Sequence, residues 1–233
     1  MKNFVKITLA VFSLIAVFTT SALTQVKYGM DFYSHYIWRG ADLSAQSLQP
    51  ALSYTTGNLS FGAWGSFSTT NSYFENDLWG SYGIGPVAVY VTDYYIPTFL
   101  PPTATFFNYN TAKGAGSHVV EVGLGYTGPA SMPISIAGYY DVIGGTPDPD
   151  NSSYIQASYP YAVDSTTTLT FTVGLTPAKS TVWYTTAKAG LINVGVQAAK
   201  TIKITDSFSL PVNAQYILNP YLEKTYLIFG ISL

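Results

Sequence analysis

Hydrophobic and polar residues alternate along most of this chain. The clearest case is the stretch 48–68, in which two arms flank a Gly-Asn turn. After that turn, Leu59, Phe61, Ala63 and Phe67 alternate with small or polar residues. A period of two on both sides of a tight turn is typical of a β-hairpin with one apolar face. This hairpin must place its apolar face against a second sheet or against lipid.

The same pattern continues to the end of the chain and predicts about twelve strands. They cover residues 27–40, 48–56, 59–68, 74–82, 87–95, 118–126, 134–142, 153–159, 167–175, 189–204, 208–218 and 224–233. The connections between them alternate in length, and the longer ones are 41–47, 69–73, 96–117, 143–152, 176–188 and 219–223. Short turns alternating with longer loops are typical of an outer-membrane barrel. An even number of strands also lets the last strand pair with the first.

One face of each strand carries the residues suited to lipid. The outward positions in the later strands are Val87, Val89, Val91, Val120, Val122, Leu124, Ile134, Ile136, Leu169, Phe171, Val173, Leu175, Ile192, Val194, Val196, Ala198, Leu210, Val212, Ala214, Leu227, Phe229, Ile231 and Leu233. The opposite positions are mostly Ser, Thr, Gly, Asn and Gln. Because backbone groups in hydrocarbon must all be hydrogen-bonded, a sheet in lipid has to close.

Composition favours lipid over a second sheet. Only 9% of the 233 residues are charged, whereas 16% are aromatic, and a typical soluble domain has about 25% charged residues. After the N-terminal segment, the chain has no run of the ~20 apolar residues that a spanning helix needs. A secreted β-sandwich is the alternative, but it gives no reason for loop length to alternate. We therefore predict an all-β fold, a closed antiparallel transmembrane β-barrel of about 12 strands in an up-and-down meander.

The N-terminus has the pattern of a signal peptide. Lys2 and Lys6 precede an apolar core, and Thr20, Ser21 and Ala22 form a small-residue cleavage region. We predict a signal peptide at 1–24 and one barrel domain at 25–233, located in the bacterial outer membrane.

Little in the sequence indicates catalysis. There is no cysteine, and the two histidines lack metal-site spacing, so we predict no metal and no cofactor. Ser34 and His35 are adjacent and therefore point to opposite faces of a strand. His118 is predicted to be a surface or rim residue. The loop 148–151 has two Asp residues that could attract Ca²⁺, although a plain turn explains them as well. We predict that the protein is not an enzyme, and a lipid hydrolase using His35 is a remaining alternative.

Charged and aromatic side chains at inward positions predict where a pore would be lined. These residues are Asp31, His35, Arg39, Trp64, Glu75, Asp77, Glu121, Asp141 and Lys224. Charges at membrane depth must face water or one another, so they indicate either a hydrated pore or a packed interior with ion pairs. Acids outnumber firm bases, which predicts a mild cation preference. Arg39 is expected to form a constriction or an ion pair, with Asp31, Glu75 or Asp77 as partner.

The first third of the mature chain resembles a known family. The residues that carry the resemblance are Tyr36 to Gly40, Leu43-Ser44, Gln49 to Leu52, Phe61 to Ser66 and Glu75 to Asp77. They resemble the TorF family of bacterial outer-membrane β-barrels, formerly a conserved family of unknown function whose members are proposed to be porins. The resemblance implies a barrel and a pore but no substrate and no catalytic residues. The chain departs from the common assembly signal, because Leu233 replaces the terminal aromatic residue.

These observations predict a porin-like channel for passive diffusion of small hydrophilic solutes or ions. The expected partners are outer-membrane lipid, the solutes and the barrel-assembly machinery. Nucleic acid is not expected, because the net charge is -2 and Lys and Arg do not cluster. A non-conducting structural or surface-binding barrel is the first alternative.

Overall fold

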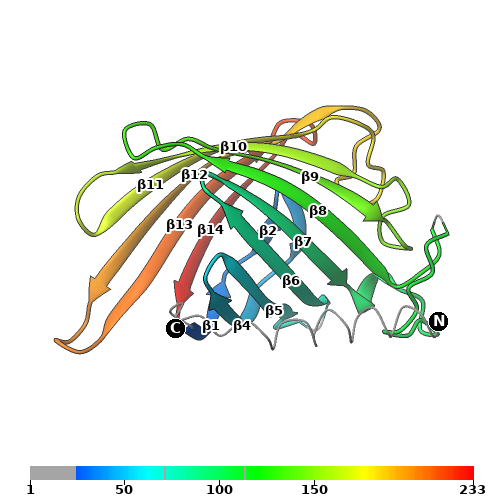
Figure 1. Ribbon diagram of the computed structural model, residues 1–233, viewed down its shortest axis with the longest axis horizontal. Helices are drawn as coiled ribbons and strands as arrows, with labels where there is room; N and C mark the ends of the chain where they lie inside the picture. Colours follow the sequence, from blue (N-terminus) through cyan, green and yellow to red (C-terminus); the bar gives the residue numbers. More distant parts are fainter. Residues whose placement is uncertain (1–24, 71, 113) are drawn as a thin grey trace.

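The computed structural model describes residues 25–70, 72–112 and 114–233, so the predicted signal peptide lies outside the described residues. Within them, twelve strands form one closed antiparallel barrel, in which each strand pairs with its neighbours and the last pairs with the first (Figure 1). This confirms the predicted fold class.

The barrel strands are β1 (Gln25–Tyr33), β4 (Ser47–Thr56), β5 (Leu59–Ser68), β6 (Phe74–Ile84), β7 (Val87–Tyr95), β8 (His118–Thr127), β9 (Ser135–Ile143), β10 (Ser153–Ala162), β11 (Thr167–Thr176), β12 (Gly190–Lys203), β13 (Ser209–Asn219) and β14 (Lys224–Ser232). A single turn of 3₁₀ helix, η2 (Pro97–Phe99), follows β7. The β10–β11 and β12–β13 turns lie at the left of Figure 1, and the long β7–β8, β9–β10 and β11–β12 loops lie at the right.

The outer surface of the barrel is apolar. Outward side chains such as Leu124, Tyr216 and Phe229 are 59%, 51% and 57% exposed. Burying these side chains in lipid is favourable, and the closed sheet satisfies the backbone hydrogen bonds that hydrocarbon would leave unpaired. A closed antiparallel barrel with this outer face is the architecture of outer-membrane proteins. Among the described residues, no helix has the length and apolar character needed to cross a membrane.

The first predicted strand, 27–40, is too long. β1 ends at Tyr33, and the following residues form a separate hairpin of β2 (Tyr36–Trp38) and β3 (Ala41–Ser44). The backbone reverses at Arg39 and Gly40, where φ is 51° and 81°. Because these left-handed conformations cannot continue a strand, the segment turns back instead of extending the wall.

The predicted outward position of Ile192 is also wrong. Ile192 is 1% exposed and packs inside the barrel. Leu175 pairs with Leu191 whereas Gly174 pairs with Asn193, so Ile192 is an extra residue in β12. A bulge of this kind shifts the alternation by one position, which returns Leu191 to the outer face and buries Ile192.

Candidate functional site

The lumen near the long loops is packed with large side chains. We call this packed group the lumen cluster. Its buried members are Tyr36, Tyr73, Tyr94, Ile96, Val119, Tyr154, Trp183, Tyr184 and Ile192, and its partly buried members are Trp38, Leu43, Trp64, Tyr139 and Tyr221. The cluster joins the β2–β3 hairpin, the wall and the β11–β12 loop. The hairpin therefore occupies the interior of the barrel.

Arg39, at the tip of this hairpin, forms a buried bidentate ion pair. Its Nη1 and Nη2 donate to the two carboxylate oxygens of Glu121 at 2.5 and 2.9 Å, and Nη1 also donates to the Tyr184 hydroxyl at 2.9 Å. The side chains of Arg39 and Glu121 are 11% and 4% exposed. A bidentate pair in this setting fixes orientation as well as charge. Burial raises the pKa of Tyr184, on the β11–β12 loop, well above its ordinary value, which keeps its hydroxyl protonated.

Three aromatic rings surround the same guanidinium. Its central carbon lies 4.4, 4.0 and 4.8 Å from the ring centroids of Trp38, Tyr139 and Tyr154. The ring faces carry negative partial charge and attract a cation within about 6 Å. The hairpin tip is thus held by an ion pair and by rings from three parts of the chain.

Gly40 allows the hairpin to seat closely against β12. A Cβ at this position would lie 1.9 Å from the carbonyl oxygen of Ile192. On the neighbouring strand, the Asn219 amide donates to the Gly40 carbonyl oxygen at 3.0 Å. Only glycine fits this close approach with a positive φ.

The expected ion pair of Arg39 is present, but the three predicted partners are wrong. Arg39 pairs with Glu121 on β8. Glu75 instead accepts hydrogen bonds from the hydroxyls of Tyr36 and Tyr73, at 3.1 and 2.9 Å. The pairing could not be read from strand parity, because Arg39 lies on an inserted hairpin and not on a wall strand.

The structure places the other predicted site residues in two environments. Glu75, Asp77, Glu121 and Asp141 are only 3%, 6%, 3% and 1% exposed. Trp64 packs on Tyr36, with 5.7 Å between ring centroids.

The remaining predicted residues are more accessible. Asp31 lies on the wall at an inward position and is half-buried. His35 bonds Asp42 within the hairpin segment at 2.8 Å. Lys224 is exposed at the start of β14.

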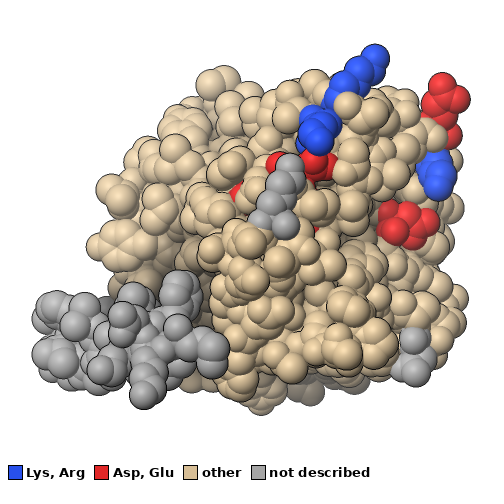
Figure 2. Space-filling view, turned by 90° about the vertical axis from the view of Figure 1, so that its right-hand side faces the viewer, with Lys and Arg blue, Asp and Glu red and all other residues tan. Residues whose placement is uncertain are grey.

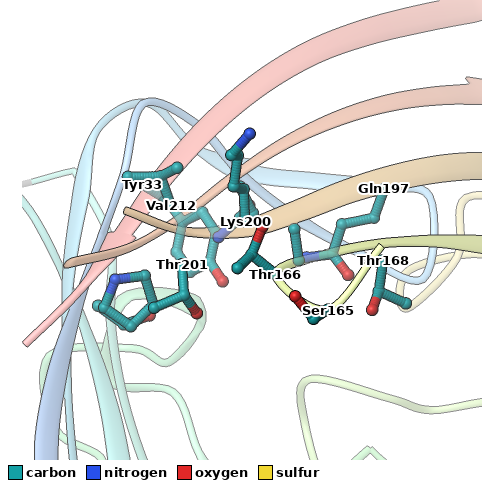
Figure 3. Close-up of a pocket in the computed structure, with 12 residues that line it drawn as sticks. Tyr33, Ser165, Thr166, Thr168, Gln197, Lys200, Thr201 and Val212 are labelled. Atoms are coloured by element: carbon teal, nitrogen blue, oxygen red, sulfur yellow. The ribbon is translucent and has the colours of Figure 1, made fainter. Parts of the chain in front are cut away.

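Among the described residues, the lumen holds a larger and a smaller cavity, and Tyr33 lines both. The larger, of about 410 Å³, lies beside the β10–β11 turn and β11 to β14, with Thr168, Gln197, Asn213 and Ser232 on its wall (Figure 3). The smaller, of about 190 Å³, lies beside the hairpin and is also lined by His35, Tyr36, Ile37, Gln49, Gln215 and Ile228. Most of these residues were not among the predicted lining residues, which were chosen mainly for their charge. Their inward parity was the available signal.

His118 was predicted to be a surface or rim residue. It is instead buried, with an exposed fraction of 1%. Its ring stacks on Tyr109 with 3.8 Å between centroids, and its Nδ1 lies 2.7 Å from Asp93 Oδ1. The Tyr109 hydroxyl donates to Asp93 at 2.6 Å. Burial first, and then Asp93, raises the pKa of Tyr109 above its ordinary value. Strand alternation puts Asp93 and His118 on the outward face, so the β7–β8 loop folds over the outside of the wall.

The β9–β10 loop and the β11–β12 loop are joined to each other by an ion pair and hydrogen bonds. Lys179 Nζ lies 2.7 Å from Asp150 Oδ1, and Thr181 also donates to the Asp150 carboxylate. Asp148 accepts from the backbone N–H and hydroxyl of Ser152, at 2.5 and 2.7 Å. These acids thus hold loop structure together. Figure 2 shows the loop-bearing face, where the charged side chains lie over one part and most of the visible surface is uncharged.

No family model matches the chain, and no curated protein matches it. The resemblance to the TorF family therefore stays a prediction.

Solved structures of outer-membrane barrels do match. A KdgM porin in complex with disordered oligogalacturonate has a TM-score of 0.47 and 8% identity, covering 90% of this chain and 98% of that chain. The COG4313 outer membrane channel from Pseudomonas putida F1 has a TM-score of 0.43 and 16% identity, covering 93% and 95%. Because these TM-scores are below 0.5, the fold assignment rests on the strand pairing of this chain, and the functional proposal rests on its site.

Proposed function

We propose that this protein is an outer-membrane channel for passive diffusion of small hydrophilic solutes or ions. The observation that carries the proposal is the pair of cavities inside a closed barrel that the lumen cluster does not fill, of which the larger is lined mainly by polar groups. A barrel of about twelve strands is wider than the eight-stranded size that side chains fill completely. The inserted hairpin occupies part of the lumen, so we expect a narrow passage and a small conductance.

A mild cation preference belongs to the same proposal. Among the predicted lining residues, Arg39 is neutralised by Glu121. Asp31 is the accessible acid among them. It pairs with Ser232 on β14, which lines the larger cavity, and with Gln49 on β4, which lines the smaller one. A carboxylate beside the passage raises the local concentration of cations.

A non-conducting barrel is the second candidate, and the lumen cluster favours it. If the hairpin never leaves its seat, the ion pair and rings around Arg39 would seal the lumen at the long-loop end. The barrel would then serve as a surface for its outer loops. No comparable observation favours a hydrolase: the hydrogen bonds of His35 and His118 within the described residues go to Asp42, Asp93 and the Phe106 carbonyl oxygen, and none goes to a serine or threonine hydroxyl that could act as nucleophile.

Conductance of the purified, refolded protein in a planar lipid bilayer separates the two candidates. A channel gives discrete current steps in KCl, and a salt gradient gives a reversal potential of the sign expected for cations. Protein whose unheated gel mobility differs from that of the boiled sample, confirming a folded barrel, but which gives no current would overturn the channel proposal. Clear anion selectivity would overturn the cation preference alone.

A further inference from the structure

Tyr33 is the side chain that the two cavities share. A Cβ on Gly230, which pairs with Tyr33 across β1 and β14, would lie 2.4 Å from Tyr33 Cε1. One edge of the ring, at Cδ1 and Cε1, therefore lies against the wall at this glycine. The Asn213 side chain lies beside it, because the same Cβ would be 2.7 Å from Asn213 Nδ2. Tyr33 thus forms a fixed ledge between the cavities, and we call it the Tyr33 ledge.

Four carboxamide side chains lie beside the ledge. Asn213 and Gln197 lie on the larger cavity, and Gln49 and Gln215 lie on the smaller. The Gln215 amide donates to Asn213 Oδ1 at 3.2 Å, which links the carboxamides of the two cavities. Each carboxamide offers both donors and acceptors. The row can therefore exchange hydrogen bonds with a solute that carries both.

Two cationic groups near the lumen, Arg39 and Lys200, are held away from this row. The Arg39 guanidinium is bound to Glu121 on β8, whereas the row lies on β1, β4, β12 and β13. Lys200 also borders the larger cavity, but it pairs with the outward residue Val212. In Figure 3 its side chain points away from Ser165 and Thr166. Along this row, an anion would lose hydration without gaining an opposite charge.

We propose that the Tyr33 ledge and the carboxamides around it form a binding site for a small neutral polyhydroxylated solute, such as a mono- or disaccharide. This inference rests on the proposed channel function and names its solute class. The C–H face of a sugar ring can lie on the tyrosine ring, while its hydroxyls bond the carboxamides. The larger cavity falls within the ~300–1,000 Å³ range of ligand sites, and the smaller falls below it. Solute would therefore be held beside the ledge and pass it one molecule at a time.

The test combines single-channel current with calorimetry of the detergent-solubilised barrel, using maltose as the neutral probe and glucuronate as the anionic one. We expect maltose to reduce the KCl current in a concentration-dependent manner and to give a binding isotherm, with glucuronate much weaker in both. Asn213→Leu should weaken maltose binding by roughly three- to tenfold, as expected for one or two lost hydrogen bonds. Tyr33→Ala should weaken it more than Tyr33→Phe.

Two threonines provide a matched control. Thr168 lines the larger cavity, whereas Thr55 points into the lumen on β4 and bonds Ser60 at 2.9 Å without lining either cavity. Thr168→Val should weaken maltose binding and Thr55→Val should not. Equal effects of the two variants, or glucuronate binding as tight as that of maltose, would overturn the site.

The two proposals can fail separately. A barrel that conducts KCl but shows neither current block nor heat with maltose keeps the channel function and loses the solute class. A folded barrel that gives no current but binds maltose with the expected variant pattern keeps the site and loses the channel.

Discussion

The two sides of the lumen differ in residue type and in what those residues do. The lumen cluster consists of large apolar and aromatic side chains, and the buried ion pair of Arg39 and Glu121 lies against them. The cavity row contains carboxamides and hydroxyls around the Tyr33 ledge. A buried charge is tolerated only with a partner, so Arg39 and Glu121 fix the hairpin in place. Neutral groups cost less to desolvate than charges, which suits them to line the passage.

Substitutions on the two sides should also differ in their free-energy cost. Removing one partner of a buried ion pair leaves an uncompensated charge, which costs about 3–5 kcal/mol. Removing one neutral hydrogen-bonding group costs about 0.5–1.5 kcal/mol. Variants of the packed side should therefore change stability and conductance, and variants of the cavity row should change solute binding.

The largest effect on conductance is expected from Gly40→Val. The added Cβ would lie 1.9 Å from the Ile192 carbonyl oxygen, and φ at Gly40 is 81°. The hairpin tip therefore cannot keep its position against β12. Single-channel conductance should rise several-fold. Tryptophan fluorescence should shift to longer wavelength because Trp38 becomes more exposed to water. Gly138→Val is the matched control, because a Cβ there has nothing within 4 Å. Unchanged conductance in a folded Gly40→Val barrel would show that the hairpin does not obstruct the passage.

The next effect is on stability. Arg39→Leu and Glu121→Gln should each lower the free energy of unfolding by about 3–5 kcal/mol, because the remaining group loses its buried partner. Denaturant titration in detergent, followed by tryptophan fluorescence, measures this loss. The double variant should lose less than the sum of the two single variants.

An ion pair with one exposed partner provides the comparison. Lys179 is 59% exposed, and Asp150, which is 4% exposed, also accepts from the Thr181 N–H. Asp150 therefore keeps a hydrogen bond without the lysine, and Lys179→Leu should cost no more than about 1 kcal/mol. Similar losses for Lys179→Leu and Arg39→Leu would contradict the distinction between the buried pair and the loop pair.

A smaller effect is expected on ion selectivity. Asp31→Asn removes the accessible carboxylate beside the cavity row, so the cation-to-anion permeability ratio should fall toward one. The reversal potential in a KCl gradient measures this ratio. Asp141→Asn is the control, because Asp141 is 1% exposed and faces no water. A larger change for Asp141→Asn than for Asp31→Asn would move the selective step into the packed side.

The smallest effect on conductance is expected outside the lumen. His118→Ala removes the ring that stacks on Tyr109 and bonds Asp93, so the β7–β8 loop should detach from the outer wall. Chymotrypsin should then cleave faster near Phe107, which is already 80% exposed. Current steps should not change, because His118 does not face the lumen. His35→Ala should leave the cleavage rate unchanged, and an altered conductance in His118→Ala would contradict the outer placement of this residue.

Local pattern in the sequence was sufficient for the wall. Alternation of apolar and polar residues determines which side of a strand meets lipid, and turn residues determine where a strand ends. Strand number, closure and the outward face were therefore predictable. Parity also placed Glu75, Asp77, Glu121 and Asp141 on the inner face. It failed at Ile192 because one extra residue in β12 reverses the alternation, and nothing in the local pattern marks that bulge.

Only the tertiary structure decided what fills the barrel. Arg39 meets Glu121 across 82 positions of sequence and Tyr184 across 145, and no periodic pattern encodes contacts at such separations. The hairpin lies inside because the chain leaves the wall after Tyr33, reverses at Arg39 and Gly40, and buries a guanidinium that requires a carboxylate and ring faces. By itself, the sequence determined a closed barrel with an apolar exterior, since each strand presents its own two faces. The folded chain determined which polar residues pair and which line a cavity, because that depends on segments that meet only after the barrel closes.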